Sequence, residues 1–228
     1  MNGILGPVRC RAVAAAIVAI LISVQALVAA EFTLQLSESV LASAERKFGP
    51  EARQRLADWV KLVASNKKKS DAEKLRLAND FFNQVPFVSD AEHWTRRDYW
   101  ATPTEMLATN GGDCEDYSIG KYFTLLALGM NMDRLRITYV KATTLPPADQ
   151  AHMVLTYYAT PDAVPLVLDN LQPIIKPASE RGDLIPVYSF NGDGLWLAKE
   201  RGAGRSAGGA SRISLWTELN ARMGKEFL

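Results

Sequence analysis

The sequence predicts an α+β fold in which helices come first along the chain and a mainly antiparallel sheet follows. Up to about residue 128, apolar residues recur at helical spacing. From residue 135 onward, the apolar segments are short and rich in β-branched and aromatic residues, which is typical of strands. Helices and strands do not alternate, so the order favours an α+β fold over a parallel α/β sheet.

The composition is that of an ordinary globular protein. Of 228 residues, 48% are hydrophobic and 22% are charged, which argues against disorder or a coiled coil. The 26 basic and 25 acidic residues give a net charge of +1, so there is no electrostatic footprint for nucleic acid. With two cysteines and two histidines, the chain has too few ligands for a zinc finger and too few thiols for a disulfide framework.

The first 30 residues predict a secretory signal peptide. Arg9 and Arg11 precede an uncharged apolar run over 12–30, which ends in the small residues Val-Ala-Ala. The alternative is an uncleaved membrane anchor, because the run is about as long as a minimal span of ~20 residues. We therefore expect a signal peptide over 1–30, or an anchor, followed by a single domain over 31–228.

In the first half of that domain, capping residues and apolar periodicity mark the helices. Pro50 suits the first turn of a helix, and the segment Ser70-Asp71-Ala72-Glu73 has the pattern of a capping box. An ordered loop with short helical turns is expected over 88–110. A further helix is expected over 114–128, with Gly129 as its stop.

The second half predicts strands and a hairpin. The Asn-Gly-Asp-Gly sequence at 191–194 is a turn signal between two apolar segments. The Gly/Ala/Ser-rich segment over 201–211 is expected to be mobile, and a short amphipathic helix over 213–223 closes the chain. Strands are expected over 135–143, 152–160, 166–171, 187–190 and 195–197.

Cys114 is the candidate nucleophile. Once residues 1–30 are removed it is the one remaining cysteine, and it stands at a predicted helix start directly after Gly111, Gly112 and Asp113. Unpaired backbone N–H groups and the helix dipole favour an anion there, which stabilises a thiolate. The alternative is that Cys114 is a small buried hydrophobic residue, as free cysteines often are.

His152 and Asp169 are candidate partners for this thiol. They lie near the ends of two predicted strands that are consecutive along the chain, so pairing of the strands makes them neighbours. A nucleophile, a base and a residue that orients the base must meet in space, not in sequence. Two alternatives remain at this point: His152 as a core histidine bonded to a carbonyl, and Asp169 as a turn residue.

Three acids, Asp113, Glu115 and Asp116, surround Cys114. Taken singly, they are explained as helix caps and first-turn charges. Together they disfavour an ionised sulfur, and a bound cation relieves that conflict. Carboxylate oxygens select a hard ion such as Ca²⁺, in an irregular site because the spacing is not that of an EF-hand. Capping and calcium binding both stay open on chemistry alone.

Three separated blocks, 111–117, 151–155 and 165–171, resemble the bacterial transglutaminase-like cysteine proteinase family, and segments 99–105 and 186–191 agree with it. The resemblance covers roughly residues 45–200. It implies a papain-like or transglutaminase-like core with the nucleophile at a helix N-terminus and an antiparallel sheet that carries the His and the Asp. The implied site residues are a triad of Cys114, His152 and Asp169, together with the calcium ligands Asp113, Glu115 and Asp116.

The resemblance also implies a function. It implies a calcium-dependent cysteine endopeptidase in the periplasm, which cleaves the N-terminal region of a large outer-membrane adhesin and so promotes biofilm dispersal. The implied partner is an inner-membrane cyclic di-GMP receptor of the LapD type, which sequesters the protease. Two alternatives are a transglutaminase-like acyltransferase and a catalytically inactive periplasmic binding module. A second oxyanion donor and a role for 201–211 are not assigned by the sequence.

Overall fold

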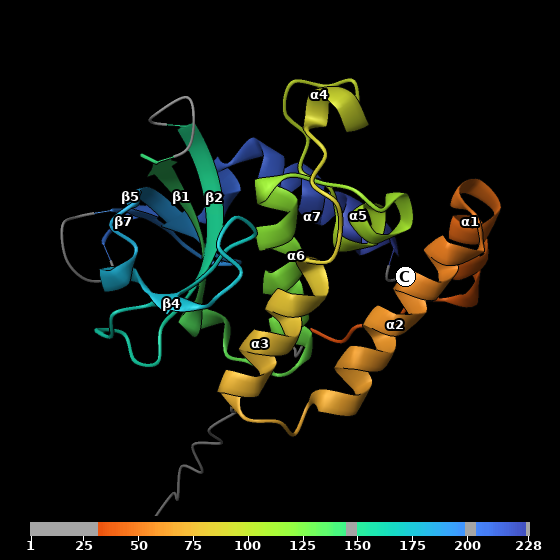
Figure 1. Ribbon diagram of the computed structural model, residues 1–228, viewed down its shortest axis with the longest axis horizontal. Coiled ribbons are helices and arrows are strands. Elements are labelled where there is room, and N and C mark those ends of the chain that lie inside the picture. The colour runs from red at the N-terminus through yellow and green to blue at the C-terminus, as the bar shows by residue number, and fades with distance from the viewer. Residues whose placement is uncertain (1–31, 145–149, 199–203, 227–228) are drawn as a thin grey trace, which may run out of the picture. The chain divides into compact units, whose positions relative to one another are not determined.

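Helices gather on one side of the fold and the sheet lies on the other, with α6 between them (Figure 1). The computed structural model describes residues 32–144, 150–198 and 204–226. The predicted signal peptide lies outside the described residues, so the expectation for 1–30 stays a prediction. Within the described ranges, no helix combines the length and the apolar character that crossing a membrane requires.

Most helices precede the sheet along the chain, as the sequence predicts. The short turns expected over 88–110 are present as two brief helices, α4 and α5. The helices are α1 (Glu38–Phe48), α2 (Pro50–Asn66), α3 (Asp71–Phe82), α4 (Asp90–His93), α5 (Pro103–Thr109), α6 (Cys114–Ala127) and α7 (Ser214–Glu226), with 3₁₀ turns η1 (Met132–Arg134), η2 (Ala178–Glu180) and η3 (Ala210–Arg212).

Local signals in the sequence explain where these helices begin and end. Ser70 and Glu73 form the predicted capping box at the start of α3. Beyond α6, Gly129 adopts a φ of 83°, a left-handed conformation that glycine tolerates and that ends helices. Gly120 permits close packing of α6 on α3, because a Cβ there would lie 2.2 Å from the Phe82 ring. The helix that carries Cys114 is therefore firmly held.

In the described part of the chain the strands form one seven-stranded sheet, in the order β4-β3-β2-β1-β5-β6-β7, with antiparallel neighbours throughout. The predicted hairpin around 191–194 is confirmed as the pairing of β5 with β6. The strands are β1 (Leu135–Ala142), β2 (Gln150–Tyr157), β3 (Leu166–Leu168), β4 (Lys176–Pro177), β5 (Leu184–Phe190), β6 (Leu195–Leu197) and β7 (Arg205–Gly208).

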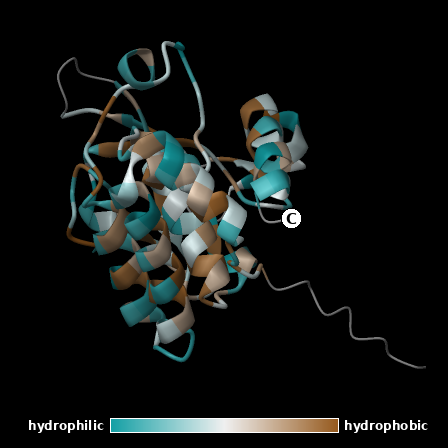
Figure 2. Cartoon of the chain, turned by 90° about the vertical axis from the view of Figure 1, so that its right-hand side faces the viewer, coloured by the Kyte–Doolittle hydropathy of each residue, from teal (hydrophilic) through white to brown (hydrophobic). Residues whose placement is uncertain are grey.

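Side chains alternate between the two faces of this sheet. Ile137, Leu155 and Leu168 are buried in the main core, which they share with the apolar faces of the helices. Figure 2 shows brown apolar and teal polar residues alternating along the helices, as amphipathic packing requires. Val140 and Val154 point the other way, into a small separate cluster on the opposite face of the sheet.

Several expected strand bounds need correction: β3 ends at Leu168 and not at 171, and β5 begins at Leu184 and not at 187. Part of the segment 201–211, expected to be mobile, forms β7, because Arg205–Gly208 pairs with β6 at the edge of the sheet. The strand with His152 begins at Gln150, two residues earlier than expected, because β1 continues far enough to pair with it. The helix α1 was not predicted. It begins at an N-cap, Ser37, whose side chain accepts from the Val40 N–H.

Candidate active site

Cys114 is the first residue of α6, as the sequence predicts. The two glycines before it allow a tight approach of the chain. A Cβ on Gly112 would lie 2.7 Å from Asp116 Oδ2, and one on Gly111 would lie 2.8 Å from the His93 ring. The Asp116 carboxylate in turn accepts from the Asp113 backbone N–H at 3.2 Å, so it completes a cap at the helix start. Glycine is needed here because the neighbouring side chains fill the space.

The surroundings of the Cys114 thiol are acidic and partly closed. Its Sγ donates to Glu115 Oε2 at 3.0 Å. Burial, and then the charge of Glu115, raise the pKa of the thiol, while the Met153 backbone N–H acts in the lowering direction. The helix start alone was expected to lower this pKa. Burial and neighbouring carboxylates thus outweigh the helix dipole at this sulfur.

His152 and Asp169 form a buried pair. The expected pairing of their strands is present, since β2 and β3 are antiparallel neighbours. His152 Nε2 and Asp169 Oδ1 share a hydrogen bond of 2.8 Å, and Asp169 Oδ1 also accepts from the Leu171 N–H at 3.0 Å. Burial acts to raise the pKa of Asp169, but the bond and charge of His152, with Arg181 and the Leu171 N–H, lower it to about 2. Asp169 therefore stays ionised beside the imidazole.

Two residues that sequence analysis did not single out also hold Asp169. The Arg181 Nη2 donates to Asp169 Oδ2 at 2.7 Å, and Asn83 Nδ2 donates to the Asp169 backbone oxygen at 3.0 Å. Arg181 follows η2 and Asn83 caps the end of α3, so both are remote in sequence from Asp169. Neither lies in a motif, and only the fold brings them to the carboxylate.

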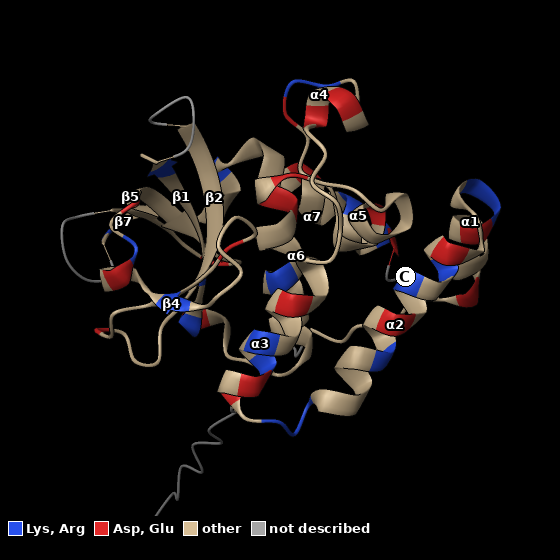
Figure 3. Ribbon diagram, in the orientation of Figure 1, with Lys and Arg blue, Asp and Glu red and all other residues tan. Residues whose placement is uncertain are grey.

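Acidic side chains from three segments meet at the start of α6. Figure 3 shows acidic residues on α4 and at the N-terminal end of α6. Besides the expected Asp113, Glu115 and Asp116, the cluster includes Asp90 from α4 and Asp98 from the loop after it. Possible ligand atoms lie within 4.8 Å of one another in three overlapping groups: Asp113 with Cys114 and Glu115, Asp90 with Asp113 and Asp116, and Asp90 with Asp98 and Glu115.

Some carboxylate oxygens of this cluster lack a hydrogen-bond partner in the protein. Within the described part of the chain, Asp90 Oδ1 and Asp113 Oδ1 are buried with no hydrogen-bond partner. Burial, followed by repulsion from neighbouring acids, raises the pKa of Asp116 and that of Asp113. Burial likewise raises the pKa of Asp90 to about 6. Unpaired buried carboxylate oxygens from separate segments fit a hard divalent cation, which ligates through oxygen.

The two halves of the candidate site approach each other through α6 and β2. The Met153 N–H faces the Cys114 sulfur, and Met153 directly follows His152. Among the described residues, however, the hydrogen bond of the thiol goes to Glu115 and not to His152. A cavity of about 650 Å³ lies elsewhere, on the sheet face opposite the helices, and is lined by Val140, Val154 and their neighbours.

Comparison with known proteins identifies the family. The family model described as bacterial transglutaminase-like cysteine proteinase matches residues 52–186, more than half of the chain. The chain therefore belongs to this family of cysteine proteinases. A comparison with curated protein sequences gives no match.

Solved structures of one bacterial protein are similar to the chain. LapG of Legionella pneumophila, treated with EGTA, is 44% identical, with a TM-score of 0.72 over 84% of this chain and 99% of the LapG chain. Calcium-bound LapG of the same organism is 45% identical, with a TM-score of 0.69 over 82% of this chain and 98% of the LapG chain. The relative was thus studied with and without calcium.

Proposed function

We propose that this LapG-like cysteine proteinase is a calcium-dependent endopeptidase that acts through Cys114, His152 and Asp169. The observation that supports the proposal is the buried pair of His152, on β2, with Asp169, just after β3, because the next residue of β2, Met153, directs its N–H to the Cys114 sulfur. A cysteine at the start of a core helix and a histidine bonded to an ionised carboxylate are the groups that thiol catalysis needs.

Each residue has a distinct task in this mechanism. Cys114 gives its proton to His152, and its sulfur attacks the peptide carbonyl carbon to form a tetrahedral intermediate. His152 then protonates the leaving amine, and a thioester remains. Water, activated by the same imidazole, hydrolyses the thioester and regenerates the thiol. Asp169 accepts from Nε2 throughout, so that Nδ1 is the nitrogen free to exchange the proton with Cys114. The Cys114 backbone N–H, at the helix start, is one oxyanion donor.

The acidic cluster fits Ca²⁺, with Asp90, Asp98, Asp113, Glu115 and Asp116 as the residues that hold it. The orphaned oxygens of Asp90 and Asp113 support this assignment. When bound, the ion supplies positive charge that offsets the repulsion among the carboxylates around the thiol. Asp90 and Asp98 extend the ligand set expected from the sequence, because α4 and its loop fold back over the start of α6.

The cellular role follows from the family resemblance. With residues 1–30 as a signal peptide, the enzyme acts in the periplasm. Its substrate is the N-terminal region of a large outer-membrane adhesin, and cleavage releases the adhesin and promotes biofilm dispersal. An inner-membrane cyclic di-GMP receptor of the LapD type sequesters the enzyme. The similarity to LapG over nearly the full length of that protein supports this role.

Incubation of the purified protein with an N-terminal adhesin fragment and Ca²⁺ tests the function. Two fragments of lower mass are expected from wild type, and none from Cys114→Ala. Products of higher mass would instead indicate the acyltransferase, and a stable complex without turnover would indicate a binding module. Cleavage by Cys114→Ala at the wild-type rate would contradict the assignment of the nucleophile.

A further inference from the structure

Among the described residues, Arg181 is the arginine that hydrogen-bonds Asp169 of the proposed triad. It lies in the turn between η2 and β5, and 6% of its side chain is exposed. Its Nη2 reaches Asp169 Oδ2 at 2.7 Å, on the oxygen that His152 does not use. The two Asp169 oxygens are thus divided between the imidazole and the guanidinium.

Arg181 is itself fixed by Asp183. The Arg181 Nε donates to Asp183 Oδ1 at 2.9 Å, and Nη2 donates to Asp183 Oδ2 at 2.8 Å. This two-point contact sets the plane of the guanidinium, because an arginine fork and a carboxylate match in geometry. Nη2 donates to both carboxylates. Hydrogen bonds therefore connect Asp183, Arg181, Asp169 and His152 in one continuous row.

The Asp169 carboxylate needs the arginine to stay ionised. Asp169 is almost fully buried, and a buried carboxylate without a cation tends to bind a proton. A protonated Asp169 would hold the imidazole less firmly. Lys121 on α6 also acts on Asp169 through its charge, but within the described residues its buried Nζ has no hydrogen-bond partner. Arg181 alone combines charge with a directed contact.

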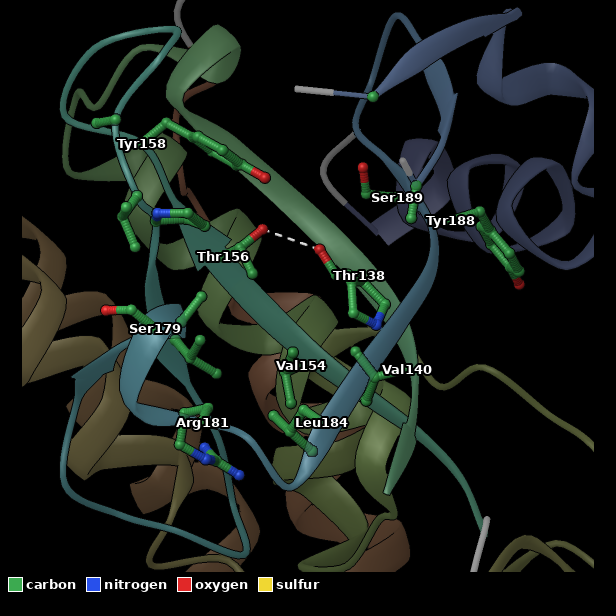
Figure 4. A pocket seen from close by; sticks show the side chains of 18 of the residues that line it. Thr138, Val140, Val154, Thr156, Tyr158, Ser179, Arg181, Leu184, Tyr188 and Ser189 are labelled. Atoms are coloured by element: carbon green, nitrogen blue, oxygen red, sulfur yellow. Dashed lines mark hydrogen bonds between the residues drawn. The ribbon is translucent and has the colours of Figure 1, made fainter. Parts of the chain in front are cut away.

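We propose that Arg181 is a positioning residue that holds Asp169 ionised and oriented toward His152, with Asp183 fixing Arg181 in turn. This inference rests on the proposed function, because the orientation of His152 matters for catalysis only if His152 is the base of the triad. The contacts that carry it are independent of substrate and of calcium. Arg181 also borders the cavity on the sheet face opposite the helices, where Figure 4 shows it to the left of Leu184.

The test follows the ring N–H of His152 by NMR in the full chain with Cys114→Ala and Ca²⁺ present. A ring proton bonded to a buried carboxylate exchanges slowly with water. Arg181→Met should accelerate this exchange by roughly tenfold, because the bond between the carboxylate and the imidazole then opens at a lower free-energy cost. The exchange rate in Arg181→Lys should lie between those of wild type and Arg181→Met, because lysine keeps the charge but loses the two-point geometry of the guanidinium. Arg136→Met, which removes a buried arginine stacked on Trp196, is the matched control and should leave the signal unchanged.

Two results would overturn the proposal. One is wild-type exchange of the His152 proton in a folded Arg181→Met protein, with folding checked by circular dichroism. If Arg181→Met does not fold, Asp183→Asn is the second test of the proposal. This variant keeps Arg181 but weakens the two-point contact that fixes its guanidinium. Faster exchange then supports the proposal, and unchanged exchange overturns it.

Kinetics separate this inference from the proposed function. With a cleavable adhesin fragment, Arg181→Met should lower kcat and leave KM near the wild-type value, since no substrate contact is lost. A raised KM with unchanged kcat would overturn a positioning role. If the wild-type protein cleaves no fragment, the proposed function fails, and the NMR result still decides whether Arg181 orients the pair.

Discussion

The Cys114 thiol donates a hydrogen bond to Glu115 Oε2 at 3.0 Å, so the proposed nucleophile is bonded to a proposed calcium ligand. The same carboxylate oxygen cannot serve the thiol and an ion equally well. Glu115 and the half-buried Asp113 place negative charge beside the sulfur, where it opposes ionisation. Glu115 therefore links the proposed calcium site to the reactivity of the thiol.

The first prediction is that Ca²⁺ increases the reactivity of the Cys114 thiol. In a Cys10→Ala background, where Cys114 is the only thiol, iodoacetamide should alkylate the protein roughly tenfold faster with Ca²⁺ than with EGTA, because the ion takes up the Glu115 carboxylate. Mass spectrometry measures the rate. Glu92→Gln, at an exposed acid of α4, should keep this response. Equal rates with and without Ca²⁺ in the Cys10→Ala protein would contradict the link.

The second prediction separates capping from metal binding. If Asp113 and Glu115 only stabilise the start of α6, then Asp113→Asn with Glu115→Gln should cost little, about 0.3–1 kcal/mol for a lost first-turn charge. If they ligate Ca²⁺, calorimetry should show that calcium binding by the double variant is lost. Unchanged heats of binding would leave capping as their role.

The sequence predicts the arrangement of the helices and the sheet because capping residues, glycine stops and strand composition are local signals. Ser70 with Glu73 and the turn at 191–194 show this directly. The strand β7 could not be predicted from local composition, because glycine, alanine and serine do not favour a strand. Pairing with β6 makes Arg205–Gly208 a strand.

The candidate site also contains residues that the sequence predicts and residues that only the fold brings together. Asp113, Glu115 and Asp116 adjoin Cys114 in the sequence, so their proximity is predictable. Asp90 and Asp98 join them only because the chain folds back between Val88 and Gly112, where the Val88 N–H donates to the Gly112 oxygen at 2.9 Å. Arg181 reaches Asp169 through tertiary structure alone, and no spacing rule anticipates it.

The third prediction concerns the relative importance of His152 and Asp169. His152→Ala should abolish cleavage of an adhesin fragment, because no other base stands in its place. Asp169→Asn should keep the fold but lower kcat by about 10²–10⁴, since an amide holds the imidazole in the wrong tautomer. Steady-state kinetics measure both. Full activity of His152→Ala would remove His152 from the mechanism.

The fourth prediction is a loss of stability in acid that depends on Asp169. Its pKa in the folded chain, about 2, lies below the ordinary value near 3.9, so the folded state favours the ionised form. This contribution, on the order of 2 kcal/mol, is complete above about pH 5 and disappears as the pH falls toward 2. Urea unfolding in EGTA at pH 5 and pH 3 measures it. Asp169→Asn should lose less stability over that interval than wild type, and an equal loss would contradict the assignment.

The fifth prediction concerns Lys121, a buried lysine at the centre of α6. Its side chain is fully buried, its Nζ has no hydrogen-bond partner among the described residues, and the Tyr117 ring centroid lies 5.9 Å away. Burial lowers the pKa of Lys121 to about 7, against the opposing charges of Asp169 and Asp80. The unfolded chain keeps this proton up to about pH 10. Between these values the unfolded state binds more protons, so the free energy of unfolding should rise with pH.

Lys121→Met removes the buried charge and nearly keeps the volume. At pH 7 we expect the variant to be more stable than wild type by about 1–3 kcal/mol, because replacing a poorly compensated buried charge by an apolar side chain is often stabilising. Between pH 7 and 9, the free energy of unfolding of the variant should also rise less steeply with pH than that of wild type. The difference in slope should be up to about 1.4 kcal/mol per pH unit. Urea unfolding at the two pH values measures both effects, with the exposed Lys68→Met as the control. A less stable Lys121→Met protein with the wild-type pH dependence would mean that the charge of Lys121 is compensated in the folded chain.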